Sequence, residues 1–262
     1  MASNLRIQLN AWLGCPKPNP RAQMRLFCFP YAGGTAAIFR AWPDLLLTTS
    51  VEVCVIHLPG RAGRLQEPPF THLLSLVQEI APAIRPFLDK PFAFFGHSMG
   101  ALISFELARQ LRRERAPAPA QLFLSGRSAA HLPDVEPRTF DLPEAEFIQE
   151  LRRLNGTPQE VLEHPELMHL MIPLLRADFS VCQTYEYEKG PPLDSPITIF
   201  GGLQDFEAPR AHLEAWREHT SSTFKLRMLP GDHFFLNSEQ ALLLNTLSQE
   251  LGVLIPTTAT SI

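Results

Sequence analysis

One short stretch constrains the fold of this chain more than any other: Phe92–Ala101, with the sequence FAFFGHSMGA. An apolar run with strand character ends in Gly-x-Ser-x-Gly, and a helical pattern begins directly after it. A serine on so sharp a strand-to-helix turn needs neighbours without bulk two positions away, and Gly96 and Gly100 supply them. We therefore predict that Ser98 lies on a strained turn, with its hydroxyl above the end of a sheet and at the amide end of a helix.

The three fixed positions of this motif are weak by themselves, because a chain of this length matches them by chance about one time in ten. The flanking sequence distinguishes a functional motif from a chance match. The residues before the motif are typical of a buried strand, and residues 101–111 are good helix formers with apolar positions at helical spacing. The stretch thus indicates a nucleophilic serine and not an ordinary turn serine.

Composition is compatible with one ordinary globular domain. The chain has 262 residues, of which 45% are apolar and 19% charged, so we expect a single domain over residues 1–262. The net charge of −4 does not indicate the basic surface that nucleic-acid binding requires. Met1–Gln23 lacks a basic region followed by an apolar core, and no apolar run approaches the length of a membrane span. We expect a cytoplasmic protein without nucleic-acid or membrane partners.

The cysteines are scattered along the chain without the spacing of metal ligands: Cys15, Cys28, Cys54 and Cys182. Reduced, structural cysteines are the favoured interpretation. The sequence gives no indication of a metal or a cofactor.

Strand and helix patterns alternate along most of the chain. Strands are predicted over residues 25–30, 51–58, 92–95, 121–126, 197–202 and 224–230. A helix with apolar positions from Leu73 to Ile84 is predicted to bend or end near Pro82 and Pro86. Such alternation is typical of a parallel sheet wound by right-handed crossovers.

A glycine-rich loop, Tyr31–Thr35, follows the first of these strands. In folds with a serine on a strand-to-helix turn, this loop carries half of an oxyanion hole. Two backbone amides, one from Met99 and one from about Ala32, would then converge on the developing negative charge. The alternative is a plain tight turn. The loop lacks the third glycine and the Gly-Lys-Ser/Thr ending of nucleotide-binding loops.

An acid and a histidine follow the last two predicted strands, at Asp205 and His233. Serine, acid and then histidine is the chain order of the α/β-hydrolase triad. In that arrangement His233 takes the proton of Ser98, and Asp205 fixes the imidazole tautomer. Asp232 is disfavoured as the orienting acid because adjacent side chains rarely fold back on each other, and His57 is interpreted as structural.

Between residues 127 and 190 no strand pattern is found. Helices are predicted over residues 144–154, 158–163 and 165–185, the last interrupted at Pro173. We interpret this insertion as a helical lid across the edge of the sheet where open α/β folds bind ligands. Its apolar residues either line an acyl-sized cavity or pack helix on sheet: Phe147, Leu151, Leu154, Met168, Met171, Leu174, Leu175 and Phe179. Asp178 and Asp134 are alternatives for the acid.

Several motifs spread over residues 25–251 give the chain a family resemblance: FPYAGG (29–34), LPGR (58–61), GHSMGA (96–101), SGR (125–127), LLRAD (174–178), GGLQD (201–205) and GDHFF (231–235). Together they resemble the type II thioesterases of polyketide and nonribosomal peptide assembly lines, which belong to the α/β-hydrolase superfamily. The resemblance implies a mostly parallel central sheet flanked by helices, with a helical lid insertion.

The resemblance also implies a function. The substrate would be an acyl, aminoacyl or peptidyl thioester on the phosphopantetheine arm of an acyl or peptidyl carrier protein. Its hydrolysis would free the carrier. The resemblance assigns Ser98, Asp205 and His233 to a catalytic triad and Met99 and Ala32 to the oxyanion hole, with no cofactor and no metal.

Other functions remain open at this point. A general carboxylesterase or lipase would use the same residues on a freely diffusing ester, and some relatives release medium-chain fatty acids. A catalytically silent binding protein is disfavoured because serine, acid and histidine are all retained. Arg61, Arg64 and Arg127 lie in loops predicted near the site, where they either attract an acidic carrier or form local ion pairs. We expect a monomer.

Overall fold

A computed structural model describes residues 10–48, 50–134 and 137–255, so the outermost parts of the predicted domain and residues 135–136 of the predicted lid lie outside the described residues. In this part of the chain a seven-stranded sheet has the order β1-β3-β2-β4-β5-β6-β7. The strands are β1 (Leu13–Gly14), β2 (Met24–Phe29), β3 (Val51–Ile56), β4 (Phe92–His97), β5 (Gln121–Ser125), β6 (Ile197–Gly202) and β7 (Phe224–Leu229). β1 runs antiparallel to β3, and the other neighbouring pairs are parallel.

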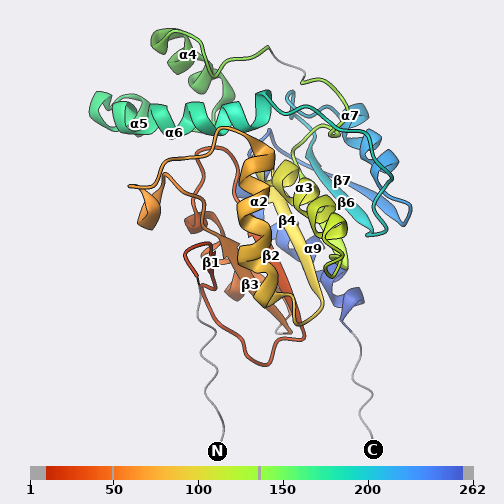
Figure 1. The fold of residues 1–262 in the computed structure, drawn as a ribbon. Helices are drawn as coiled ribbons and strands as arrows, with labels where there is room; N and C mark the ends of the chain where they lie inside the picture. Colours follow the sequence, from red (N-terminus) through yellow and green to blue (C-terminus); the bar gives the residue numbers. More distant parts are fainter. Residues whose placement is uncertain (1–9, 49, 135–136, 256–262) are drawn as a thin grey trace, which may run out of the picture.

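Helices cover both faces of the sheet (Figure 1). They are α1 (Trp42–Leu45), α2 (Leu73–Ile84), α3 (Met99–Arg113), α4 (Glu144–Leu154), α5 (Gln159–Leu162), α6 (Pro165–Gln183), α7 (Arg210–Glu214), α8 (Phe235–Ser238) and α9 (Gln240–Leu254). Single 3₁₀ turns lie at Ala36–Phe39, Ala62–Arg64, Arg85–Phe87 and Ala215–His219. The apolar faces of α2 and α3 pack on one side of the sheet, and those of α1 and α9 pack on the other. No helix in the described ranges is long and apolar enough to span a membrane.

The six predicted strands are confirmed with small differences at their ends. β1 was not predicted, because two residues are too few to show the alternation of a strand. The predicted helix before β4 is confirmed as α2, which runs through Pro82 and gives way to a 3₁₀ turn at Arg85–Phe87. The predicted interruption at Pro173 is wrong: α6 is continuous, because a proline costs one helical hydrogen bond and the flanking turns remain buried.

The strand order places the predicted site residues on one edge of the sheet. β2 and β4 are neighbours in the middle of the sheet. β3 and β1 lie beyond β2, and β5, β6 and β7 lie beyond β4. Ala32 follows β2, Ser98 follows β4, Asp205 follows β6 and His233 follows β7. Because these strands are parallel, all four loops leave from the same edge, where open α/β sheets bind their ligands. In Figure 1 the helices α4–α6 lie across one end of the sheet.

Candidate active site

The turn at Ser98 has the strained geometry that the sequence predicts. Ser98 has a positive φ of 52°, which L-residues adopt at a cost. A Cβ atom on Gly96 would fall on the carbonyl of Gly100, and one on Gly100 would fall on the carbonyl of Phe29. Both glycines are therefore required for the turn to close. Ser98 stays partly exposed, whereas Met99, the first residue of α3, is fully buried.

Asp205 and His233 form a buried hydrogen-bonded pair. His233 Nδ1 lies 2.9 Å from Asp205 Oδ2. Asp205 Oδ1 accepts hydrogen bonds from the amides of Glu207 (2.9 Å) and Ala208 (3.1 Å). A carboxylate held in this way can only accept, so the imidazole donates from Nδ1 and keeps Nε2 free to take a proton.

The charge around His233 favours its protonated form. Burial alone would lower the pKa of His233, but the hydrogen bond to Asp205 and the negative charges of Glu207 and Asp205 outweigh burial and raise it. Glu207 Oε1 lies 3.8 Å from His233 Nδ1. That oxygen is buried and has no hydrogen-bond partner among the described residues, and burial raises the pKa of Glu207.

Two neighbouring cavities meet at Ser98 in the described part of the chain. Their volumes are about 100 and 240 Å³, and Ser98, His233 and Ala32 line both of them. The larger cavity is also lined by apolar residues from α4 and α6: Leu151, Leu154, Met171, Leu175 and Phe179. The other three apolar residues named from the sequence pack elsewhere: Phe147 and Met168 in the helix–helix core, and Leu174 against Gly60.

A buried ion pair, which the sequence analysis missed, fixes the glycine-rich loop. Arg61 donates from both terminal nitrogens to Asp178 of α6, over 2.6 and 2.7 Å. Asp178 also accepts from the Gly33 amide at 2.7 Å, and Arg61 donates to the Gly34 carbonyl at 3.1 Å. The two residues appear in the motifs LPGR and LLRAD, but nothing in a single sequence pairs them.

Of the two alternatives left open by the sequence, attraction of an acidic carrier or a local ion pair, this geometry supports the local ion pair for Arg61. Its side chain is only 6% exposed and its charge is matched by Asp178, so it presents no cationic surface. Arg64 is paired with Glu67, with its guanidinium 4.1 Å from the ring centroid of Trp12. Of the three arginines named from the sequence, Arg127 alone lines a cavity at Ser98.

The alternative acids are engaged away from the imidazole. Asp178 pairs with Arg61 as described, and Asp134 pairs with Arg127 at 2.7 Å. Asp232 Oδ1 accepts from the amide of Phe234, so its side chain turns back on its own loop. Of the predicted acids, Asp205 is the one that is hydrogen-bonded to His233.

Two other histidines, His57 and His97, differ in their distance from the site. His57 follows β3 and lies beside Gly14, at the β1 edge of the sheet, which fits the structural role expected for it. His97 is buried next to His233, with ring centroids 5.1 Å apart, and its Nδ1 lies 2.9 Å from Ser125 Oγ. Burial lowers the pKa of His97 well below its ordinary value, so this ring stays neutral.

The side chains near Ser98 that could together bind a metal ion are the predicted acid and base of the triad and the neighbouring Glu207. Ligand atoms of Asp205, Glu207 and His233 lie within 4.8 Å of one another. However, both oxygens of Asp205 and Nδ1 of His233 are already used in hydrogen bonds. The arrangement suits an imidazole base with an orienting carboxylate better than it suits a cation.

Comparison with known proteins places the chain in a family. A family model described as thioesterase domain matches residues 24–251. The chain belongs to the thioesterase domain family. The chain is 46% identical to the gramicidin S biosynthesis protein GrsT of Aneurinibacillus migulanus, covering 95% of this chain and 96% of that protein. It is 49% identical to a protein of Brevibacillus parabrevis named linear gramicidin dehydrogenase LgrE, covering 92% of each.

Solved structures of thioesterases share the fold. The structure described as the type II thioesterase BorB from the borrelidin biosynthetic cluster superimposes with a TM-score of 0.84 at 32% identity, covering 92% of this chain and 98% of that one. The predicted resemblance to type II thioesterases and the predicted α/β-hydrolase fold are thereby confirmed. The protein is a thioester hydrolase.

The Arg61–Asp178 pair of this thioesterase gives a prediction about stability. Asp178→Ala should lower the free energy of unfolding by about 3–5 kcal/mol, because it leaves a buried guanidinium without a counter-charge. Urea denaturation measures the loss. The matched control is the double variant Arg61→Met with Asp178→Leu, which removes both charges and should lose less than the single variant. A loss below about 1 kcal/mol in Asp178→Ala would show that the pair does not hold the loop.

A second prediction concerns pH. With His233 as the predicted general base, catalysis requires its neutral form, so kcat/KM should fall as the pH drops through the raised pKa of this residue. Glu207→Gln removes a negative charge that raises this pKa, and the acid limb of the profile should therefore move to lower pH. The control Glu67→Gln, at an exposed carboxyl paired with Arg64, should leave the profile unchanged. An unmoved acid limb, or a shift to higher pH, would contradict the proposed influence of Glu207.

Proposed function

We propose that this protein hydrolyses acyl, aminoacyl or peptidyl thioesters on the phosphopantetheine arm of acyl or peptidyl carrier proteins in the assembly of polyketides or nonribosomal peptides. The observation that carries the proposal is the buried Asp205–His233 pair, which shares a cavity with Ser98 on its strained turn. The similarity to GrsT and BorB supports the pathway context.

The proposed reaction uses Ser98 as nucleophile. Its Oγ attacks the thioester carbonyl carbon while Nε2 of His233 takes the hydroxyl proton, and Asp205 stabilises the resulting imidazolium. The carbon–sulfur bond then breaks, and the departing thiolate receives that proton from His233. Water attacks the acyl-serine in the same way, giving a carboxylic acid and the free Ser98 hydroxyl.

The negative charge on the carbonyl oxygen needs donors that are fixed in advance. We assign this role to the amides of Met99 and Ala32. Met99 begins α3, where the first amides have no intrahelical partner and the helix dipole favours an anion. Ala32 lines both cavities with Ser98, and its loop is held by the hydrogen bond from Gly33 to Asp178. Such donors contribute about 10²–10³-fold to kcat each.

We also propose that residues 127–190 act as a lid over this site within one domain. The lid helices supply most of the apolar lining of the larger cavity, which suits an acyl chain. Because carrier proteins of assembly lines work inside the cell, we infer a cytoplasmic enzyme, and we take it to act as a monomer. Cell fractionation and light scattering check these two inferences.

The test compares a carrier-bound thioester with the same acyl group on a short pantetheine mimic, each at low and high salt. Binding energy from the carrier should raise kcat/KM by about tenfold or more for the carrier-bound form. Equal kcat/KM values without any salt effect would instead favour a general carboxylesterase. A panel of acyl groups separates the remaining alternative, because activity confined to medium-chain groups would indicate a medium-chain acyl thioesterase.

The name of LgrE raises a different activity, because it refers to a dehydrogenase. The glycine-rich loop of this chain lacks the third glycine of a dinucleotide-binding fingerprint. We therefore expect a carrier-bound thioester to yield the free acid, with no consumption of a reduced nicotinamide cofactor. Formation of an aldehyde or alcohol would support the dehydrogenase reading.

A further inference from the structure

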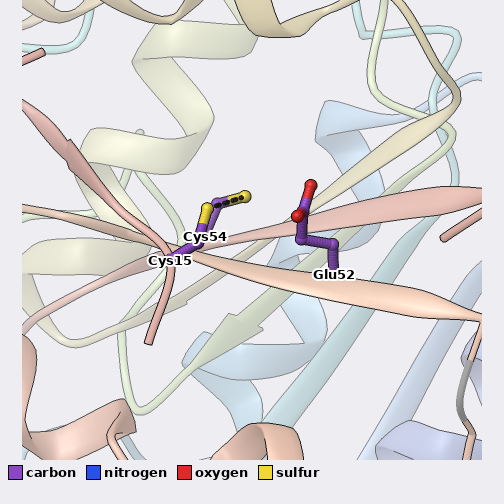
Figure 2. A group of neighbouring side chains, drawn as sticks. All are labelled: Cys15, Glu52 and Cys54. Carbon is purple, nitrogen blue, oxygen red and sulfur yellow. Dashed lines mark hydrogen bonds between the residues drawn. The ribbon is translucent and has the colours of Figure 1, made fainter. Parts of the chain in front are cut away.

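Two cysteines face each other at the edge of the sheet, far from Ser98. The register of β1 on β3 pairs Leu13 with Ile56 and Gly14 with Val55, so the next residue, Cys15, lies opposite Cys54. The two Sγ atoms are 3.2 Å apart, and Figure 2 shows them side by side. The sequence analysis missed this pair because the residues lie 39 positions apart.

The backbone at this position suits a disulfide. The amide of His57 donates to the carbonyl of Trp12 at 2.9 Å, so these two residues are a hydrogen-bonded pair of the antiparallel ladder. Hydrogen-bonded and non-hydrogen-bonded pairs alternate along such a ladder, and Cys15 and Cys54 therefore form a non-hydrogen-bonded pair. In antiparallel strands the Cα atoms of such a pair are about 4.5 Å apart. Disulfides span Cα separations of about 4.4–6.8 Å, so a bond can form here without moving the strands apart.

The two thiols differ in exposure and acidity. Cys15 is partly exposed, whereas Cys54 is buried. The hydrogen bond from the Cys54 thiol lowers the pKa of Cys15, and the same hydrogen bond, together with burial, raises the pKa of Cys54. Burial also raises the pKa of Cys28, and it raises that of Cys182 to about 12. Cys15 is therefore the thiol of the pair that a small oxidant reaches more easily and the one that ionises more readily.

The neighbouring carboxylate does not turn this pair into a metal centre. Glu52 lies close enough to complete a three-ligand cluster with both cysteines. However, its Oε2 accepts from Arg25 at 2.8 Å and its Oε1 accepts from the Asn19 amide at 2.8 Å. Figure 2 shows the Glu52 carboxylate set apart from the two facing sulfur atoms. Arg25 is buried and depends on this carboxylate, so a cation would have to displace a buried ion pair.

We propose that Cys15 and Cys54 are a reversible redox pair, which a small-molecule disulfide oxidises to a cross-link between the N-terminal segment and β3. The Cys15 thiolate attacks one sulfur of the small disulfide and releases one thiol. The Cys54 sulfur, after losing its proton, then attacks the Cys15 sulfur of the mixed disulfide and releases the second thiol. The protein loses two electrons and two protons, and the small disulfide gains them.

The cross-link would add a covalent bond to a segment that is held by non-covalent contacts. β1 contributes two residues to the sheet, and beyond it Trp12 packs against Phe70 and under the guanidinium of Arg64. A bond between Cys15 and Cys54 closes a loop of about 40 residues, which restricts the unfolded chain more than a short loop does. The oxidised protein should therefore resist thermal unfolding better than the reduced protein.

The experiment oxidises the full-length protein with oxidised glutathione and maps the product after trypsin digestion. The four cysteines fall in different tryptic peptides, covering residues 7–21, 26–40, 41–61 and 177–189, so each possible linkage has its own mass. We expect the peptides of Cys15 and Cys54 to be joined, with dithiothreitol restoring both thiols. The Tm of the oxidised protein should exceed that of the reduced protein by roughly 4–10 °C.

Two variants separate this pair from general oxidation. Cys15→Ser should lose both the linkage and the difference in Tm, while Cys182→Ser, at a buried cysteine outside the pair, should keep both. Several results would overturn the proposal: four free thiols after oxidation, a linkage between other cysteines, or glutathione that stays bound to Cys15. Purified protein that carries one equivalent of zinc and releases it only when Cys15 and Cys54 are blocked would likewise show a metal site instead.

Discussion

Ser98→Ala is expected to lower kcat for thioester hydrolysis by about 10⁶-fold. Without the hydroxyl no acyl-enzyme can form, and only binding and the oxyanion hole continue to assist attack by water. The variant should remain folded, because alanine occupies the same backbone position and removes no hydrogen bond of the sheet. Steady-state hydrolysis of one acyl thioester and a thermal melt measure the two quantities.

Ser75→Ala is the matched control, since Ser75 is exposed on α2 and lies outside both cavities at Ser98. Its activity should equal that of the unmodified protein. Substantial hydrolysis by Ser98→Ala, at an unchanged Tm, would remove Ser98 from the mechanism and with it the proposed acyl-serine.

Asp205→Asn should lower kcat by up to about 10⁴-fold. Asp205 holds Nδ1 of His233 at 2.9 Å, and its other oxygen accepts two backbone amides. An asparagine that keeps those amide bonds through its carbonyl oxygen turns its NH₂ group toward the ring. Nδ1 must then accept and Nε2 carries the hydrogen, so His233 can no longer take the proton of Ser98.

Asp232→Asn is the control for this substitution, because the neighbouring Asp232 faces the Phe234 amide and not the imidazole. It should retain most of the activity. Asp178→Asn and Asp134→Asn complete the comparison. If one of these lowered kcat more than Asp205→Asn at equal stability, the orienting acid would lie on another loop.

Local sequence patterns were sufficient to predict the strands and the turn at Ser98. Gly96 and Gly100 have a steric role that depends on residues next to them in the chain, and the structure places both against backbone carbonyls. The positions of Asp205 and His233 followed from the ends of predicted strands, because parallel strands bring their following loops to a common edge. Chain order and strand pattern were therefore sufficient to predict most residues of the candidate site.

The contacts that the sequence could not reveal join distant segments. Arg61 and Asp178 are 117 positions apart, and either one alone resembles an ordinary loop or helix charge. A loop arginine can face an acidic partner or form a local ion pair, and only the tertiary structure shows that Arg61 is buried against Asp178. β1 is likewise too short to leave a pattern, so the pairing that brings Cys15 to Cys54 depends on tertiary structure.

Reaction with a fluorophosphonate tests the central claim most directly, because this reagent reports an activated serine without requiring the natural substrate. We predict one adduct per chain, located at Ser98 by fragmentation of the labelled peptide and absent from Ser98→Ala. Labelling should slow in acid as His233 becomes protonated, in keeping with its raised pKa. An adduct at another residue, or no adduct in a protein that still hydrolyses thioesters, would contradict the serine mechanism.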